Sequence, residues 1–150
     1  MFLSYSAGLW IFSPVDSTSN MQYYIDSPFS KECLVELNQD DFPLTHKCAK
    51  HFQNDDPVVI RILHDQEIKY PLAVMMFEEK TSENIHIYSL EVHPKCRYNF
   101  YGRRMIDKLK ENHTYIDLTT LPESKIFYEK RGFNEEEDGH MVWRKPTCIK

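Results

Sequence analysis

The chain has 150 residues, of which 41% are hydrophobic and 13% aromatic, and its formal net charge at pH 7 is −5. This composition is too apolar and too aromatic for a disordered chain, and the length suits one compact domain spanning residues 1–150. The negative charge argues against nucleic-acid binding, which relies on Lys and Arg to neutralise phosphates. It is compatible with a cationic substrate such as an amine.

The cysteines and histidines do not form a recognisable framework. Cys33, Cys48, Cys96 and Cys148 are far apart and include no C-x-x-C pair. In a domain of this size, such spacing favours reduced thiols and a cytoplasmic location over disulfides. The one tight His/Cys cluster, His46-x-Cys48-x-x-His51, has spacings that do not share one helical face, so we predict no metal site.

Membrane insertion is not expected. The longest apolar runs, Gly8–Phe12 and Pro71–Phe77, fall far short of the roughly 20 residues needed to cross a bilayer. Met1–Pro14 has no basic segment and no convincing cleavage site, which argues against a signal peptide. We expect its aromatic residues to form a first strand instead.

The N-terminal half contains two predicted helices between two turn-rich clusters. The clusters are Ser13–Asn20 and Gln53–Pro57, which combine Pro with small polar residues. The helices are Ser30–Leu37 and Asp41–Phe52, both amphipathic, and the second begins with acidic residues and Pro43. Both are expected to pack against a sheet.

Three predicted strands follow, rich in β-branched and aromatic residues: Val58–Leu63, Pro71–Phe77 and Ile85–Val92. The polar breaks between them suit antiparallel hairpins. Strict alternation along the third strand predicts one face with Ile85, Ile87 and Ser89 and the other with His86, Tyr88 and Leu90. Glu91 then falls on the face opposite His86.

The C-terminal half changes to an alternating pattern. A helix is predicted from Tyr101, with Tyr101, Met105, Ile106 and Leu109 on its buried face. A short strand, Tyr115–Leu118, comes next. Thr120-x-x-Glu123 predicts a capping box for a helix that runs to Arg131 and stops at Gly132, and His140–Arg144 predicts a last strand. Antiparallel strands followed by β-α-β-α-β indicate an α+β domain.

The segment from Leu90 to Arg104 joins a strand to a helix through a short loop. Such a junction directs backbone N–H groups and the positive end of the helix dipole at one spot, which suits phosphate oxygens. Arg97 adds a cation capable of bidentate phosphate contact, and Gly102 leaves room for a ligand to approach. From these residues alone, an ordinary strand-to-helix turn with surface arginines is equally compatible.

Two motifs in the right order make a more specific case. Residues 90–102 read L-x-V-x-P-x-x-R-x-x-x-x-G, which resembles the pyrophosphate loop V-x-P-x-x-[RQ]-x-x-G-x-[GA] of the GNAT superfamily of N-acetyltransferases. One helix and one strand later, Ile126–Phe133 resembles the second hallmark of that superfamily, F-Y-E-K-x-G-F. The chain departs from the pattern at three positions. Phe100 and Tyr98 replace glycines of the loop, and Leu121 replaces a frequent asparagine.

The resemblance implies a mixed, mostly antiparallel sheet of about seven strands, flanked by helices and splayed at its middle. Acetyl-CoA would lie between the strand ending at Val92 and the strand Tyr115–Leu118, and its acetyl group would pass directly to an amine. Tyr128 would protonate the departing thiolate. The implied cofactor-binding residues are Leu90, Val92, Arg97, Tyr98, Asn99, Phe100, Tyr101, Gly102 and Arg103.

The general base and the charge around the site stay open at this point. His86 is a candidate base because an imidazole can accept a proton from an ammonium group, and Glu91 and Glu78 are alternatives. The acidic run Glu135–Asp138 is expected in a solvated turn, where it could also attract a cationic amine. Lys130 and Arg131 are expected on a solvated face, with contact to the 3′-phosphate of CoA as the alternative.

Three functions are compatible with these observations. The first is an acetyl-CoA-dependent N-acetyltransferase, which Arg97, Gly102 and Tyr128 favour. The second is a non-catalytic GNAT-like module that binds CoA, or nothing, and acts in regulation or interaction, which Phe100 and Leu121 favour. The third is an unrelated α+β domain that matches by coincidence. The sequence leaves open both the acceptor and whether the chain forms a homodimer.

Overall fold

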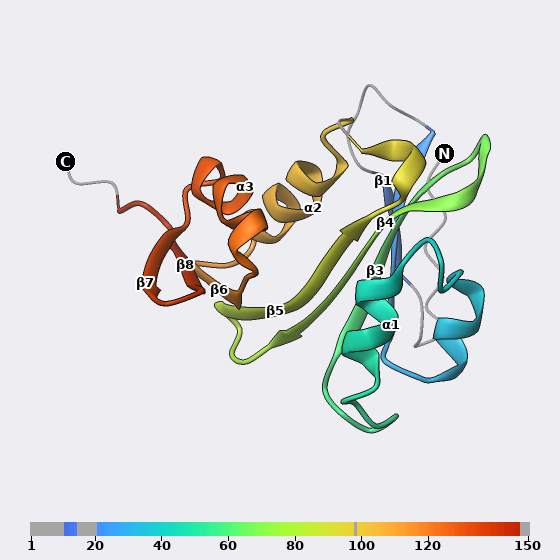
Figure 1. Ribbon diagram of the computed structural model, residues 1–150, viewed down its shortest axis with the longest axis horizontal. Coiled ribbons are helices and arrows are strands. Elements are labelled where there is room, and N and C mark those ends of the chain that lie inside the picture. The colour runs from blue at the N-terminus through green and yellow to red at the C-terminus, as the bar shows by residue number, and fades with distance from the viewer. Residues whose placement is uncertain (1–10, 15–20, 98, 148–150) are drawn as a thin grey trace.

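A computed structural model describes residues 11–14, 21–97 and 99–147 of the chain. Its strands form one eight-stranded sheet in the order β1-β2-β3-β4-β5-β6-β8-β7 (Figure 1). The β5–β6 pair is parallel and the other pairs are antiparallel. The predicted α+β fold with a mixed, mostly antiparallel sheet is therefore confirmed, with eight strands rather than about seven.

Every strand predicted from Val58 onward is present, and two further strands were not predicted as strands. The strands are β1 Ile11–Pro14, β2 Gln22–Pro28, β3 Val59–Asp65, β4 Ile68–Glu79, β5 Asn84–Val92, β6 Tyr115–Thr119, β7 Asn134–Glu137 and β8 His140–Arg144. The sequence did not indicate β2. The acidic run was expected in a turn, but most of it forms the exposed strand β7, so that prediction is wrong.

The helix predicted from Tyr101 is present as expected, whereas the other helices are shorter than their sequence patterns suggested. The α-helices are α1 Pro43–Ala49, α2 Tyr101–Lys110 and α3 Lys125–Lys130, and the 3₁₀ turns are η1 Glu32–Glu36, η2 Pro94–Cys96 and η3 Pro122–Ser124. The predicted capping box is wrong, because the chain first forms η3 and the Thr120 hydroxyl donates to the carbonyl of Leu121 instead. The predicted stop at Gly132 is confirmed by its φ of 91°.

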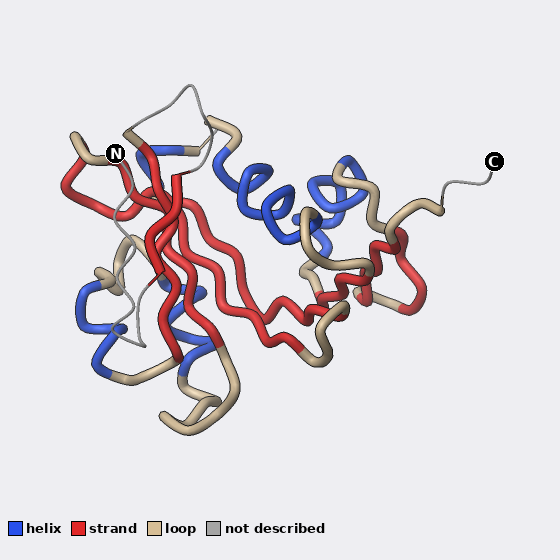
Figure 2. Tube along the Cα trace, turned by 180° about the vertical axis from the view of Figure 1, so that it is seen from behind, coloured by secondary structure: helices blue, strands red, loops and turns tan. Residues whose placement is uncertain are grey.

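The helices cover the two faces of the sheet separately, as Figures 1 and 2 show. On one face, α2 and α3 lie over a core that includes Met105, Ile106, Ile116 and Leu118. On the other face, η1 and α1 lie over a second core that includes Phe29, Phe42, Ile60, Val74 and Met76. The C-terminal strands β6, β8 and β7 extend beyond α1, so the face of these strands opposite α2 and α3 carries polar side chains such as Asp117 and His140.

A β-bulge in β5 changes which side chains share a face. Met76 of β4 pairs with Ser89, whereas Phe77 pairs with Ile87, so Tyr88 is an extra residue on β5. An extra residue shifts the alternation by one position. Leu90 therefore points toward the α2 side, and Glu91 lies on the same face as His86. Both sequence expectations about these faces are wrong for this reason.

The sheet opens between β5 and β6. Their parallel pairing runs from Asn84 with Tyr115 to Ile87 with Leu118 and ends there, while β5 continues to Val92 alongside β4. The loop after β5 leads into α2 and the loop after β6 leads into α3. The carboxyl ends of two parallel strands thus separate where two helices begin, which is the usual place for a ligand crevice in such sheets.

None of the helices in the described residues 11–14, 21–97 and 99–147 has the length and apolar character that crossing a bilayer requires. Cys33, Cys48 and Cys96 are free thiols, and Cys148 lies outside the described residues.

Candidate active site

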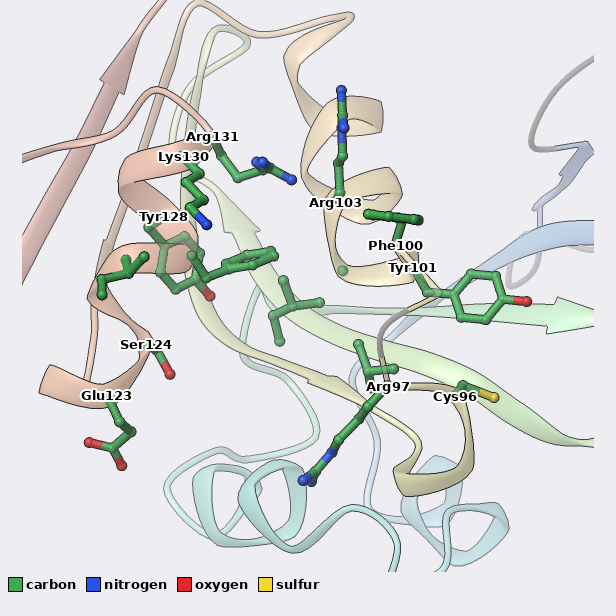
Figure 3. Close-up of a pocket in the computed structure, with 15 residues that line it drawn as sticks. Cys96, Arg97, Phe100, Tyr101, Arg103, Glu123, Ser124, Tyr128, Lys130 and Arg131 are labelled. Carbon is green, nitrogen blue, oxygen red and sulfur yellow. The ribbon is translucent and has the colours of Figure 1, made fainter.

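A groove of about 770 Å³ lies between the end of β5, the N-terminus of α2 and helix α3 (Figure 3). Its lining includes seven of the nine predicted cofactor-binding residues: Leu90, Val92, Arg97, Phe100, Tyr101, Gly102 and Arg103. Tyr128 also lines it. Asn99 is exposed and is not part of the lining, and Tyr98 lies outside the described residues. The groove is thus formed by the two segments that carry the sequence motifs.

The loop between β5 and α2 turns sharply at Phe100. Its φ of 64° places it in the left-handed region at the N-cap of α2, a conformation that glycine adopts without steric cost. The Phe100 side chain is 68% exposed. The backbone here takes the shape that the glycine of the GNAT pattern would favour, although a bulky residue occupies the position.

Gly102 has a packing role that the sequence did not predict. A Cβ atom at this position would lie 3.3 Å from Cζ of Phe127 and 3.6 Å from Cγ2 of Val92. The missing side chain therefore lets α2 pack closely on α3 and β5, rather than leaving room only for a ligand. Because Phe127 and Val92 both line the groove, this packing also sets the groove's width.

The side chains around the loop point in different directions, as Figure 3 shows. Arg97 and Arg103 are both exposed and extend to opposite sides of the loop. Tyr101 points away from α3 toward β2, where its hydroxyl accepts a hydrogen bond of 3.1 Å from Nε2 of Gln22. Arg131 points from α3 toward α2, and its guanidinium lies 5.6 Å from the ring centre of Phe127. Arginine side chains therefore approach the groove from both helices and from the loop.

Tyr128 is held in place by the helix end that the motif F-Y-E-K-x-G-F creates. The positive φ of Gly132 lets the N–H of Phe133 donate to the Tyr128 carbonyl at 3.1 Å, as in a Schellman motif. The Phe133 ring then packs edge-on against the Tyr128 ring at 5.6 Å. Tyr128 is 7% exposed, and its hydroxyl points into the space between α3 and β5 (Figure 3).

Burial raises the pKa of Tyr128 from 10.0 to about 12. The phenol therefore stays protonated at physiological pH, which is the state that a proton donor requires. The same apolar surroundings would also raise the pKa of a thiol released beside it, because burial disfavours both anions.

Several residues that line the groove were not predicted as site residues. They are Cys96, Glu123, Ser124, Ile126, Phe127, Lys130 and Arg131. Lys130 and Arg131 were expected mainly on a solvated face, yet both border the groove from α3. Phe127 was expected only in the core. Its place next to Tyr128 in the motif was the available signal, and Ile126, Phe127 and Tyr128 all line the groove.

His86 does not line the groove. It lies on the other face of β5, where Asp117 Oδ1 is 2.9 Å from its Nδ1 and the ring of Tyr88 contacts it edge-on at 4.7 Å. The pairing of β5 with β6 ends one residue after His86. A molecule reaching the opening between these strands from this face would therefore pass the His86 side chain.

The two alternative bases are already engaged. The Glu91 carboxylate is 8% exposed and accepts hydrogen bonds from Leu44 N, Thr45 N and Thr45 Oγ1 at 2.8–3.2 Å, so it caps the N-terminus of α1. Glu78 accepts from the Tyr88 hydroxyl at 2.7 Å and pairs with Lys80 at 3.2 Å. Burial acts to raise the pKa of Glu78, but these two partners outweigh it and the pKa is lowered, which makes the carboxylate a weaker base.

Charge pairing reduces the field of the acidic run. Glu135 lies 3.0 Å from Lys125 and accepts from the Gly139 N–H, and Glu136 pairs with Arg144. These partners lower the pKa values of both carboxyl groups. The Gly139 N–H has the largest effect on Glu135, and Arg144 has the largest effect on Glu136.

Among the described residues, no cluster of three or more His, Cys, Asp or Glu side chains could hold a metal ion.

Comparison with known proteins gives matches at the level of structure. No protein-family model and no curated protein sequence matches the chain. Among solved structures, Tetrahymena GCN5 matches with a TM-score of 0.60 and 13% identity, over 79% of this chain and 89% of that one. An acetyltransferase from Streptococcus agalactiae matches at 0.56 and 12%, over 85% and 99%. A GNAT-family acetyltransferase from Staphylococcus aureus matches at 0.52 and 12%, over 81% and 98%.

This chain has the GNAT fold. The match covers nearly the full length of the three neighbours, so the fold predicted from the two motifs is confirmed. In the GNAT fold of this chain, the groove lies between the loop after β5 and helix α3, the two elements that carry those motifs. The roles of the individual residues stay predictions.

Proposed function

We propose that the chain is an N-acetyltransferase that moves an acetyl group from acetyl-CoA directly to an amine. The observation that carries the proposal is the buried Tyr128 phenol, which borders a groove opened where β5 and β6 separate. A protonated phenol beside a groove of about 770 Å³ is suited to a large thioester rather than to a compact metabolite. The GNAT fold supports the same reaction class.

The groove residues fit acetyl-CoA in two ways. Its apolar wall, which includes Val92, Ile126 and Phe127, suits the pantetheine arm. The edge of β5 beyond Ile87 is not paired with β6 and offers backbone hydrogen-bonding groups to that arm. The N-terminus of α2 and the nearby Arg97 supply positive charge for the pyrophosphate. Lys130 and Arg131 add cations on the α3 side and could contact a further phosphate.

In the proposed reaction, His86 accepts a proton on one face of the sheet and Tyr128 donates a proton on the other. An ammonium acceptor gives one proton to Nε2 of His86, and its nitrogen then attacks the acetyl carbonyl carbon. The C–N bond forms as the C–S bond breaks, and the departing sulfur takes the proton of Tyr128. The second proton lost by the nitrogen returns through water to the Tyr128 oxygen. The products are an amide, free CoA thiol and one proton that His86 releases to solvent.

The net charge of −5 and the acidic strand β7 are compatible with a cationic amine, although Glu135 and Glu136 are already paired with cations. A cytoplasmic location fits free thiols at Cys33, Cys48 and Cys96.

The proposal is tested in two steps. Acetyl-CoA at 100 times its dissociation constant should stabilise the protein by about 2.7 kcal/mol in a thermal melt. A panel of primary amines, polyamines and lysine-containing peptides should then identify an acceptor through release of free CoA thiol. Stabilisation without any thiol release above the rate of spontaneous hydrolysis would contradict the enzymatic function.

One observation favours the second function, a CoA-binding module without catalysis. The exposed Phe100 side chain lines the groove beside the α2 N-terminus, where the GNAT pattern has glycine, and its bulk would hinder a phosphate group that approaches the N–H groups there. The same two measurements separate the functions, because a module would be stabilised by both CoA and acetyl-CoA and would release no thiol. An unrelated domain would respond to neither.

A further inference from the structure

Asp117 lies between two imidazole rings on the face of the sheet opposite α2 and α3. Its Oδ1 is 2.9 Å from Nδ1 of His86, and its Oδ2 is 2.9 Å from Nε2 of His140. The three side chains come from three neighbouring strands, β5, β6 and β8. Each is partly accessible, with 25%, 20% and 31% of the side chains of His86, Asp117 and His140 exposed. We refer to these three residues as the His-Asp-His cluster.

The hydrogen bonds of Asp117 fix the tautomers of both rings. An ionised carboxylate can only accept, so Nδ1 of His86 and Nε2 of His140 must both carry protons and donate. The remaining ring nitrogen of each neutral imidazole, Nε2 of His86 and Nδ1 of His140, is then a proton acceptor. Held from both sides, Asp117 cannot turn away from His86 without losing its bond to His140.

The sheet register sets the place of the cluster. His86 pairs with Asp117, and the last β5–β6 pair, Ile87 with Leu118, follows immediately. The cluster therefore borders the start of the opening whose other side is the groove with Tyr128. Its β5 neighbour is the bulged Tyr88, whose hydroxyl is committed to Glu78 at 2.7 Å, and Glu78 also pairs with Lys80. Glu78 and Tyr88 thus lie beside His86 on β4 and β5, and Asp117, which also bonds to His140 of β8, contacts it from β6.

We propose that Asp117 is a positioning residue for acyl transfer, which orients His86 so that Nε2 accepts the ammonium proton of the acceptor, and that His140 locks Asp117 in place. This inference rests on the proposed function and assigns two residues that neither sequence motif contains. The proton moves from the acceptor nitrogen to Nε2 of His86 and then to solvent, while Nδ1–H stays bonded to Asp117. The arrangement explains why a histidine on this face can serve as a base when Glu78 and Glu91 are engaged elsewhere.

The first test replaces Asp117 with Asn. The amide keeps the size of the side chain but offers one acceptor and one donor, so it cannot hold both rings in their present tautomers. Asp117→Asn should lower kcat by about 10²-fold or more, as expected for loss of an oriented general base, and should leave the KM for acetyl-CoA unchanged. His140→Phe should lower kcat less, by about threefold to tenfold, and His140→Gln, which retains an N–H donor, should restore most of it.

His113 provides a matched control, since it is another partly buried histidine beside a carboxylate. It bonds to the Leu109 carbonyl at 2.8 Å and lies 3.5 Å from Glu79, away from the cluster. His113→Gln should leave kcat unchanged. An equal loss in His113→Gln and Asp117→Asn would mean that the effect is general destabilisation, and the positioning role would be wrong.

A second measurement does not depend on turnover or on whether Asp117→Asn folds. The ¹⁵N chemical shifts of the wild-type His86 ring should show a protonated Nδ1 and an unprotonated Nε2 in the neutral state. The opposite tautomer would overturn the proposal. Turnover by the wild type together with undiminished kcat in Asp117→Asn would overturn the positioning role alone, whereas no turnover with any amine would overturn the proposed function and this role with it.

Discussion

The two faces of β5 differ in chemistry although they are separated by the thickness of one strand. The face under α2 and α3 is apolar, and the acid of the proposed reaction, Tyr128, is buried there with a pKa raised to about 12 by burial. The opposite face carries the partly exposed His-Asp-His cluster. A donor that must hold its proton benefits from burial, and an acceptor that must release its proton benefits from access to water. The β5–β6 pairing ends between the two environments, one residue after His86.

Removal of the Tyr128 hydroxyl should have the largest effect on kcat. Tyr128→Phe keeps the ring that packs on Phe127 and Phe133 but deletes the proton, so kcat should fall about 10²–10⁴-fold. The dissociation constant of acetyl-CoA and the melting temperature should stay near wild type. A parallel loss of acetyl-CoA affinity would mean that Tyr128 positions the substrate. Full activity would mean that water or another residue supplies the proton.

A substitution at Gly102 tests whether the packing of α2 on the apolar face of the sheet sets the width of the groove. Gly102→Val places methyl groups against the Phe127 ring, because even a Cβ would lie 3.3 Å from it. We expect a loss of about 1–3 kcal/mol in the free energy of unfolding from overpacking, together with weaker acetyl-CoA binding. Gly102→Ala is the control and should cost less on both measures. Normal acetyl-CoA affinity in Gly102→Val would show that the groove does not depend on this contact.

These two predictions rest on the part of the chain that the sequence predicted best. The strands β3, β4 and β5 follow from runs of β-branched and aromatic residues, and the helix end at Gly132 follows from a glycine that tolerates positive φ. Each signal is local, since the residues that specify the structure are neighbours in the chain. The motifs then place the loop after β5 and helix α3 on the two sides of one groove.

The face with His86 depends on contacts that are distant in sequence. The bulge at Tyr88 is a property of the pairing between β4 and β5, and no residue type in the run from Ile85 to Val92 marks it. The N-terminus of α1 is capped by Glu91, which lies 46 residues after Thr45. Strict alternation therefore placed Leu90 and Glu91 on the wrong faces, and local capping rules could not indicate that Glu91 caps α1. The Asp117 bonds to His86 and His140 likewise require the strand order β5-β6-β8.

The buried phenol should also leave a signature in stability at alkaline pH. Its folded-state pKa of about 12 exceeds the ordinary value of 10.0, so its stabilising contribution is complete below pH 10 and is lost as the pH rises toward 12. A shift of about two units corresponds to at most about 2.7 kcal/mol. The free energy of unfolding of Tyr128→Phe should therefore fall less steeply than that of wild type over this range. Equal slopes would show that the phenol is not desolvated in the folded protein.

The smallest expected effect concerns the acidic strand β7 and the turn after it. Replacing Glu135–Asp138 with Ser and Asn should lower kcat/KM for a cationic amine only by about twofold to threefold at low salt, and less at high salt, because screening weakens steering. The effect is small because these carboxylates are exposed and water and salt screen their field. A variant that changes only Glu137 and Asp138 removes two negative charges, and one that changes only Glu135 and Glu136 removes two and frees Lys125 and Arg144, so each should give about half of the effect. A large, salt-dependent loss in the second variant would mean that the paired carboxylates contact the acceptor directly, which would extend the acceptor site from the His-Asp-His cluster onto β7.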